Sequence, residues 1–160
     1  MDHLKDLTDK FLDMFFPKTC YGCGKVGSYL CSNCLKRIYI NWIQRCHVCG
    51  KECSLGMVHK DCVDYSFLDG LIFITLYDNF IERMILDVKY KFNFSILGDV
   101  GKVMGKFLKF YNFRENYILT PVPLHKRKKK YRGFNQAEIL ALEISKYLNK
   151  DCEELITRSR

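Results

Sequence analysis

The spacing of apolar residues predicts one strand and one helix in the segment that follows residue 68. The run LIFITLY, residues 71–77, is rich in β-branched and aromatic side chains, which favours a buried strand. After it, apolar residues return every three or four positions, at Phe80, Met84, Ile85 and Val88. That period places them on one face of a helix.

Two more helices and a second strand are predicted further along the chain. One helix begins near Ser95, the run YILTPVP at residues 117–123 favours a strand, and another helix covers about residues 135–149. The inward positions of the two helices are Leu97, Val100, Met104, Phe107, Leu108 and Tyr111, then Ile139, Leu142 and Leu148. Because strands and helices alternate, residues 68–160 are expected to form an α/β domain with a mostly parallel sheet.

An amphipathic helix is predicted for residues 1–17. Asp2 is placed to cap its first turn and Pro17 to end it. The polar face is rich in acidic residues, which disfavours a membrane surface, so we expect the helix to pack on the rest of the protein or on a partner. Its apolar face contains Leu4, Leu7, Phe11, Leu12, Phe15 and Phe16.

A second, shorter helix is predicted in the segment LKRIYINWI, residues 35–43. There Leu35, Ile38 and Trp42 recur at helical spacing. This pattern is typical of a helix that places its tryptophan in the core.

Cysteine changes the picture for residues 18–67. The chain has 9 cysteines, and three pairs of them have the spacing CxxC, as CYGC, CSNC and CHVC; a fourth pair, HKDC, has His59 in the first place. Two residues between ligands let a tight turn aim both at one point, and zinc sites are built from two such turns. The segment has few apolar residues for a core of its own, so its metal would stabilise the fold. The spacing predicts a double zinc ribbon.

Pairing the turns in chain order predicts two Zn²⁺ sites. The predicted ligands are Cys20, Cys23, Cys31 and Cys34 for the first site, and Cys46, Cys49, His59 and Cys62 for the second. Four protein ligands leave no position for water, which indicates structural metal. Spacing alone leaves two alternatives open: Cys53 could replace His59, and the turns could pair in an interleaved order. Cys152 lies outside both sets and is given no role.

Composition excludes several classes of protein. With 48% hydrophobic and 14% aromatic residues the chain is expected to fold, and 3 Pro and 10 Gly exclude a low-complexity or collagen-like chain. It has no run of 18 apolar residues, and residues 1–16 contain several aspartates, which argues against a membrane span and a secretory signal. The protein is therefore expected to be cytoplasmic, and in a reducing cytosol its cysteines are expected to bind metal rather than to form disulfides.

The net charge of +8 has a local origin. Six of the seven residues in 126–132 are basic. They are expected to form a loop beyond the carboxyl end of the second predicted strand, where α/β sheets bind ligands. Arg127 and Arg132 can each hold phosphate through two nitrogens, and a helix start after Gly133 and Asn135 offers N–H groups to an anion. The loop is therefore a candidate anion site.

The string PVPLHKRKKKYRGFNQAEILA, residues 121–141, together with LDVKYKFN and the cysteine turns, resembles the ComF family. Members of that family combine an N-terminal zinc ribbon with a domain like the type I phosphoribosyltransferases. The resemblance implies a role in DNA uptake during natural transformation and binding of 5-phosphoribosyl-1-pyrophosphate (PRPP), or a related phosphoribosyl ligand, with Mg²⁺. It also implies competence helicases or recombination proteins as partners.

The resemblance implies which residues lie near that ligand: Pro123, His125, Arg127, Arg132, Gly133, Asn135 and Gln136. The acidic pair and Thr/Gly-rich loop with which type I phosphoribosyltransferases hold PRPP have no counterpart here, since Glu153-Glu154 is followed by LITRSR. Residues 68–160 are therefore expected to be the N-terminal part of a transferase-like domain in a truncated chain. No residue is assigned to catalysis.

A non-enzymatic role is the alternative. Zinc ribbons, a basic loop and aromatic residues such as Tyr131 and Phe134 also suit a module that binds single-stranded nucleic acid, with cations on phosphates and rings stacked on bases. A zinc-stabilised protein-interaction module is a further possibility from the same residues. A steep salt dependence of binding would distinguish the nucleic-acid module from a phosphoribosyl pocket.

Overall fold

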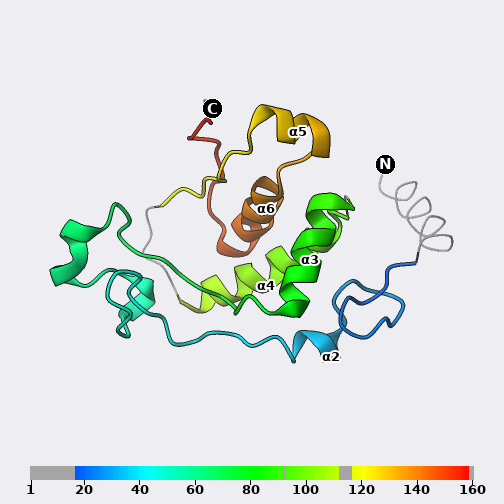
Figure 1. Ribbon diagram of the computed structural model, residues 1–160, viewed down its shortest axis with the longest axis horizontal. Helices are drawn as coiled ribbons and strands as arrows, with labels where there is room; N and C mark the ends of the chain where they lie inside the picture. The colour runs from blue at the N-terminus through cyan, green and yellow to red at the C-terminus, as the bar shows by residue number, and fades with distance from the viewer. Residues whose placement is uncertain (1–16, 92, 112–116, 159–160) are drawn as a thin grey trace. The chain divides into compact units, whose positions relative to one another are not determined.

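The computed structural model describes residues 17–91, 93–111 and 117–158 (Figure 1). The helix predicted for residues 1–17 lies, apart from its last residue, outside the described residues. The chain divides into two compact units, Met1–Ile38 and Tyr39–Arg160. In the described ranges, no helix combines the length and the apolar character that crossing a membrane requires.

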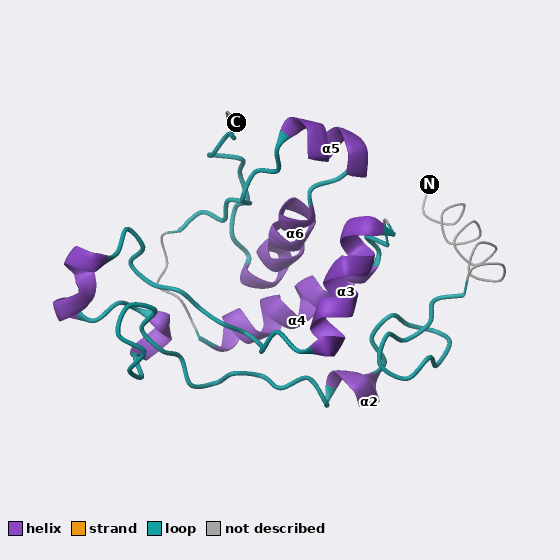
Figure 2. Ribbon diagram, in the orientation of Figure 1, coloured by secondary structure: helices purple, strands orange, loops and turns teal. Residues whose placement is uncertain are grey.

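Helices and loops make up the described residues, as Figure 2 shows. The first unit contains α2, Ser32–Leu35. The second unit contains two 3₁₀ turns, η1 (Ser54–Gly56) and η2 (Lys60–Tyr65), followed by α3 (Asn79–Tyr90), α4 (Ile96–Phe110), α5 (Lys126–Arg132) and α6 (Gln136–Leu148). The helices predicted after residue 78, near Ser95 and over residues 135–149 are therefore present as α3, α4 and α6.

Helix α3 begins at a side-chain cap and buries Met84 and Val88 of the predicted face, whereas Phe80 and Ile85 are only half-buried. The Asp78 carboxylate accepts hydrogen bonds from the N–H groups of Phe80 and Ile81, at 3.0 and 2.8 Å. Such a cap satisfies donors that a helix start leaves unpaired. Ile81, Met84 and Val88 are buried at helical spacing, so this face of α3 forms part of the core.

Helices α4 and α6 pack directly against each other (Figure 1). Ile96 and Phe107 of α4 and Ile144 of α6 are buried. The close approach of the helices depends on two glycines of α4. A β-carbon on Gly101 would lie only 2.5 Å from Glu143 Cβ, and one on Gly105 only 2.7 Å from Tyr147 Cβ. The glycines therefore let α4 and α6 approach more closely than larger residues would allow.

Both predicted strands are extended segments with a single bridge rather than regular strands. Thr75, in residues 71–77, pairs with Ile40 in an antiparallel bridge, and Leu119, in residues 117–123, pairs with Cys152 in a parallel one. A strand needs a neighbour along several residues to form a ladder, and the described segments pair at one position each. The mostly parallel sheet stays a prediction, with one parallel bridge in the described residues.

The short helix predicted over residues 35–43 is wrong. Helix α2 ends at Leu35, and Asn41 instead donates its N–H to the carbonyl of Ile74, at 2.9 Å. Pairing with a distant segment therefore overrides the helical spacing. Trp42 is also 54% exposed rather than part of the core.

The basic segment forms a helix, not the predicted loop. The His125 ring accepts a hydrogen bond from the N–H of Arg127 at 3.2 Å, which caps the start of α5. Lys and Arg are good helix formers, and Gly133, with φ of 76°, allows the left-handed turn that ends the helix.

Candidate functional site

The first group of predicted ligands is assembled by two tight turns. The Gly24 N–H donates to the Cys20 carbonyl at 2.8 Å, and Gly24 has φ of 71°, which favours glycine. The second turn opens α2, where the Cys31 sulfur accepts from the Cys34 N–H at 3.4 Å. The sulfur atoms of Cys20, Cys23, Cys31 and Cys34 all lie within 4.8 Å of one another.

The second group repeats the same turn. The Gly50 N–H donates to the Cys46 carbonyl at 2.8 Å, and Gly50 has φ of 73°. The Cys46 N–H donates to the carbonyl of Lys51, as that of Cys20 donates to Lys25, in both cases at 2.9 Å. One ligand atom from each of Cys46, Cys49, His59 and Cys62 lies within 4.8 Å of the others.

His59 is held in one orientation by its two ring nitrogens. Nδ1 lies 3.2 Å from the Cys49 sulfur, and Nε2 lies 3.1 Å from the carbonyl oxygen of Glu52. A carbonyl only accepts, so Nε2 carries the proton, and the lone pair of Nδ1 faces the cluster. A second hydrogen bond of this kind is the usual way in which a metal-binding histidine is oriented.

The geometry bears on both alternatives that spacing left open. The ligand atoms group in chain order, not in an interleaved order, and the second group contains His59 rather than Cys53. Cys53 instead donates its backbone N–H to the Gln44 carbonyl at 3.0 Å, and burial raises the pKa of its thiol. Cys53 therefore has a different environment from the grouped cysteines.

Hydrogen bonds and burial separate the pKa values of the grouped thiols. Burial opposes ionisation of Cys20, but backbone N–H donors outweigh it and lower the pKa of Cys20 to about 6; donors from Cys49 and His59 lower that of Cys46 to about 6. Burial, with the neighbouring thiols, raises the pKa of Cys34 to about 12 and of Cys62 to about 11. A divalent cation offsets repulsion among thiolates and favours the ionised form of every thiol.

The two donor sets fit zinc. Four sulfurs in one group, and three sulfurs with one imidazole nitrogen in the other, are donor sets that tetrahedral structural zinc uses. Each set is complete without water, so a bound ion would have no open position for substrate. Bound metal would instead stabilise the ribbon, which has few buried apolar side chains.

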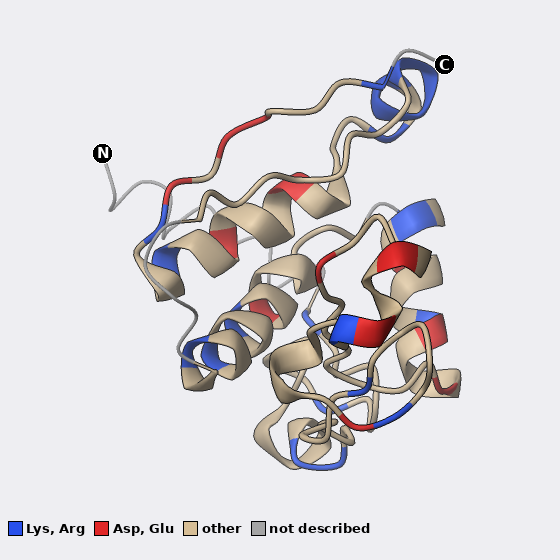
Figure 3. Ribbon diagram, turned by 90° about the vertical axis from the view of Figure 1, so that its left-hand side faces the viewer, with Lys and Arg blue, Asp and Glu red and all other residues tan. Residues whose placement is uncertain are grey.

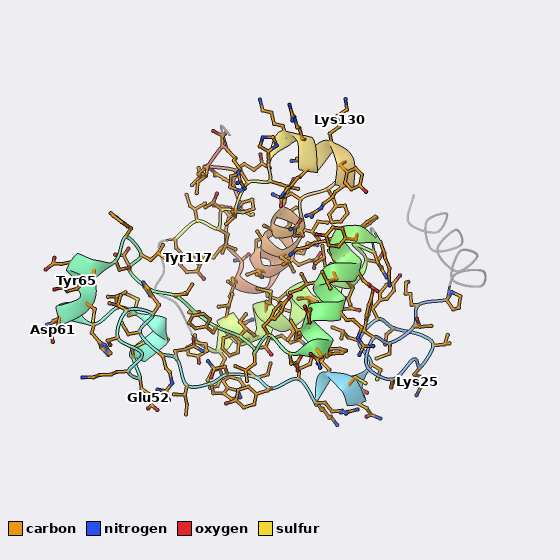
Figure 4. All side chains as sticks on the ribbon, viewed as in Figure 1. Lys25, Glu52, Asp61, Tyr65, Tyr117 and Lys130 are labelled. Carbon is orange, nitrogen blue, oxygen red and sulfur yellow. The ribbon has the colours of Figure 1, made fainter. Side chains whose placement is uncertain are left out.

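The residues predicted near a phosphoribosyl ligand lie around α5 and the start of α6. His125 caps α5. The guanidinium of Arg132, the last residue of that helix, lies 6.0 Å from the ring centre of Tyr90 and 3.4 Å from the side-chain oxygen of Gln136. Arg127 is exposed on α5, and Pro123 is half-buried before it. In Figure 3 the helix beside the C-terminus is basic along most of its length, and Figure 4 shows Lys130 pointing outward from α5.

Asn135 joins the start of α6 to the segment before α5. It is 4% exposed, accepts a hydrogen bond from the Ala137 N–H and donates to the Val122 carbonyl, both at 3.1 Å. Gly133 lies between the two helices at the end of α5. The side chain of Asn135 is thus engaged within the protein and holds the two ends of the basic segment together.

A parallel pairing follows α6. The Leu119 N–H donates to the Asp151 carbonyl at 3.0 Å, and the Glu153 N–H donates to the Leu119 carbonyl at 2.9 Å. Helices α5 and α6 connect the two paired segments. This is the connectivity of a strand, a helical crossover and a parallel strand.

Two contacts were not anticipated from the sequence. The Lys129 amine lies 3.1 Å from Glu138 and 3.6 Å from Glu154, so this lysine of the basic run is engaged by carboxylates. Buried Gln44 hydrogen bonds through its amide nitrogen to the carbonyls of Asn41 and Phe73, and through its oxygen to the Phe73 N–H. The two bonds with Phe73 join residues 29 positions apart, and no local pattern signals such a pair.

Comparison with known proteins yields two similarities. A family model described as a double zinc ribbon domain matches residues 11–63. The chain is also similar to competence protein ComFC of Bacillus subtilis (strain 168), with 26% identity over 147 residues, which are 86% of this chain and 56% of the relative. The chain thus spans just over half the length of this curated relative. No solved structure matches the chain.

These similarities agree with the geometry. The part that matches the ribbon model includes every ligand residue of both groups. The similarity to ComFC extends well beyond the ribbon, because it covers 86% of the chain. The similarities therefore support a protein of the ComF type, with a double zinc ribbon in its N-terminal part.

Proposed function

We propose that this protein acts in DNA uptake, that its zinc sites are structural, and that the region around α5 and α6 binds PRPP or a related phosphoribosyl ligand. The observation that carries the ligand proposal is the parallel pairing of Leu119 and Cys152 across α5 and α6. Ligands of α/β proteins bind beyond the carboxyl ends of parallel strands. In this chain that place is followed by the basic helix α5.

The chemistry of the segment supports an anionic ligand. The exposed guanidinium of Arg127 can form two hydrogen bonds with one phosphate, and Arg132 lies beside the start of α6. A 13-residue helix such as α6 favours negative charge at its N-terminus. Mg²⁺ would accompany a pyrophosphate, where it keeps much of its water shell.

The test is calorimetric titration of the chain with PRPP and Mg²⁺. We expect saturable binding that weakens about tenfold or more in Arg132→Ala and Arg127→Ala, since bonds to charged groups contribute about 1.5–3 kcal/mol. Lys102→Ala removes one charge from α4, where Lys102 pairs with Asp99, and should bind as wild type. Binding that is equal in all four proteins would remove α5 from the site.

Exposed cations on α5 also favour a second candidate, binding of single-stranded DNA. Lys126, Arg127, Lys128 and Lys130 are exposed, and Tyr131 is 72% exposed. Four phosphate contacts would give a log–log salt slope of roughly −3 for oligo(dT) binding. A slope near zero would contradict this candidate. Competence helicases and recombination proteins are the partners that we propose for either role.

A further inference from the structure

An exposed aromatic cluster lies at the C-terminal end of α4. The Trp42 ring lies 5.3 Å from the Phe107 ring and 5.1 Å from the Phe110 ring, measured between centres. The Tyr111 hydroxyl donates to the Trp42 carbonyl at 2.7 Å, which ties Trp42 to the C-terminal end of α4. We call Trp42, Phe107, Phe110 and Tyr111 the aromatic cluster.

The cluster has a rigid base and an exposed rim. Phe107 is 4% exposed and belongs to the core, whereas Trp42 is 54% and Phe110 is 73% exposed; the adjacent Ile43 is 54% exposed. Large side chains fixed on a packed base lose little entropy on binding, and exposed Trp is enriched at the centres of protein interfaces. The rim therefore has the chemistry of a binding surface.

Positive charge borders the rim. Lys106 lies one turn before Phe110 on the same side of α4, and Lys109 immediately precedes Phe110. Asp99, near the start of α4, pairs with Lys102, and no acidic residue follows it within the helix. A ligand that covers Phe110 would thus meet ammonium groups at its edge.

We propose that the aromatic cluster is a docking surface for an acidic, amphipathic segment of another protein. Apolar side chains of that segment cover Trp42 and Phe110, and its carboxylates face Lys106 and Lys109. This surface goes beyond the functions proposed above, because it involves neither of the two groups of zinc ligands nor α5.

Two other occupants fit less well. A second copy of the chain would bring the same lysines together on a protein of net charge +8, which opposes association. Nucleic acid stacks on open ring faces. Here the Trp42 ring already has one tilted and one edge-to-face aromatic neighbour, and the adjacent Ile43 offers no π-face.

Trp42 reports on its own surface because it is the one tryptophan of the chain. The probes are two synthetic amphipathic peptides with the same leucine face, one with glutamates and one with lysines on its polar face. We expect the glutamate peptide to shift the Trp42 emission to shorter wavelength in a saturable way, and the lysine peptide to bind at least tenfold more weakly.

Three variants make the test specific. Phe110→Ser, at an exposed position, should weaken the glutamate peptide about tenfold or more, because truncated aromatic residues at interface centres have effects of that size. Lys106→Glu should weaken the glutamate peptide and strengthen the lysine peptide. Lys146→Glu changes a lysine of α6 that pairs with Glu143 and should leave both affinities unchanged.

Several outcomes would overturn the proposal. One is equal binding of the two peptides, and another is an affinity that Phe110→Ser and Lys106→Glu leave unchanged while circular dichroism shows both folded. Self-association in sedimentation that Phe110→Ser abolishes would assign the surface to a second copy. A saturable Trp42 shift with oligo(dT) that Phe110→Ser abolishes would assign it to nucleic acid.

Discussion

Gly105 of α4 faces Tyr147 of α6 so closely that a β-carbon at position 105 would lie 2.7 Å from the Tyr147 β-carbon. The contact falls between backbone-proximal atoms, so rotation of the tyrosine side chain cannot relieve it. The distance between α4 and α6 therefore depends on a missing methyl group.

Gly105→Ala should lower the free energy of unfolding by about 1–3 kcal/mol, the usual cost of overpacking a tight contact. Gly98→Ala is the matched control within α4, because no atom lies within 4 Å of a β-carbon built there. Alanine at position 98 should be neutral or stabilising by up to about 1 kcal/mol. Urea unfolding of both variants checks the pair, and equal destabilisation would contradict the close-contact argument.

The purified chain should contain two equivalents of zinc, by elemental analysis. Replacing a buried ligand, as in Cys34→Ser or Cys46→Ser, should lower the content to one equivalent, because the group that contains the replaced cysteine keeps only three strong ligands. Cys53→Ser and Cys152→Ser are the controls and should keep both. If Cys53→Ser lost an equivalent while His59→Ala did not, Cys53 would be the fourth ligand of the second site.

Asn135→Ala should destabilise the chain by about 1–3 kcal/mol, because it removes a helix cap and leaves a buried carbonyl, that of Val122, without its donor. Asn135→Asp retains an oxygen for the Ala137 N–H but loses the N–H that reaches Val122. Urea unfolding of the two variants separates the contribution of the helix cap at Ala137 from that of the hydrogen bond to Val122. Wild-type stability in Asn135→Asp would show that the Val122 bond contributes nothing.

Cys152 should alkylate slowly with iodoacetamide below pH 9. Burial first, and then the charge of Glu138, raises the pKa of the Cys152 thiol above its ordinary value, so the reactive thiolate is scarce at pH 8 and increases as the pH rises. Glu138→Gln removes the charge and should move the rate profile to lower pH. Mass spectrometry of the Cys152 peptide gives the rate at each pH, and an identical profile in both proteins would exclude an effect of Glu138.

The cysteine spacing predicted both the turns and the residue types of the metal groups, because the required geometry is local. Each CxxC turn closes through its own backbone, as the bonds from Gly24 to Cys20 and from Gly50 to Cys46 show. Likewise, the period of three and four residues predicted α3, α4 and α6, since one helix face must be apolar to be buried.

The tertiary structure decided what depends on partners distant in the sequence. It placed His59 in the second group and left Cys53 outside, and it paired Ile40 with Thr75 where the sequence pattern predicted a helix. It also brought Trp42 onto Phe110, although 68 positions separate them. The spacing of cysteines and apolar residues along the sequence predicts which turns and helices a segment can form. Pairing between distant segments depends on surfaces that only the folded chain creates.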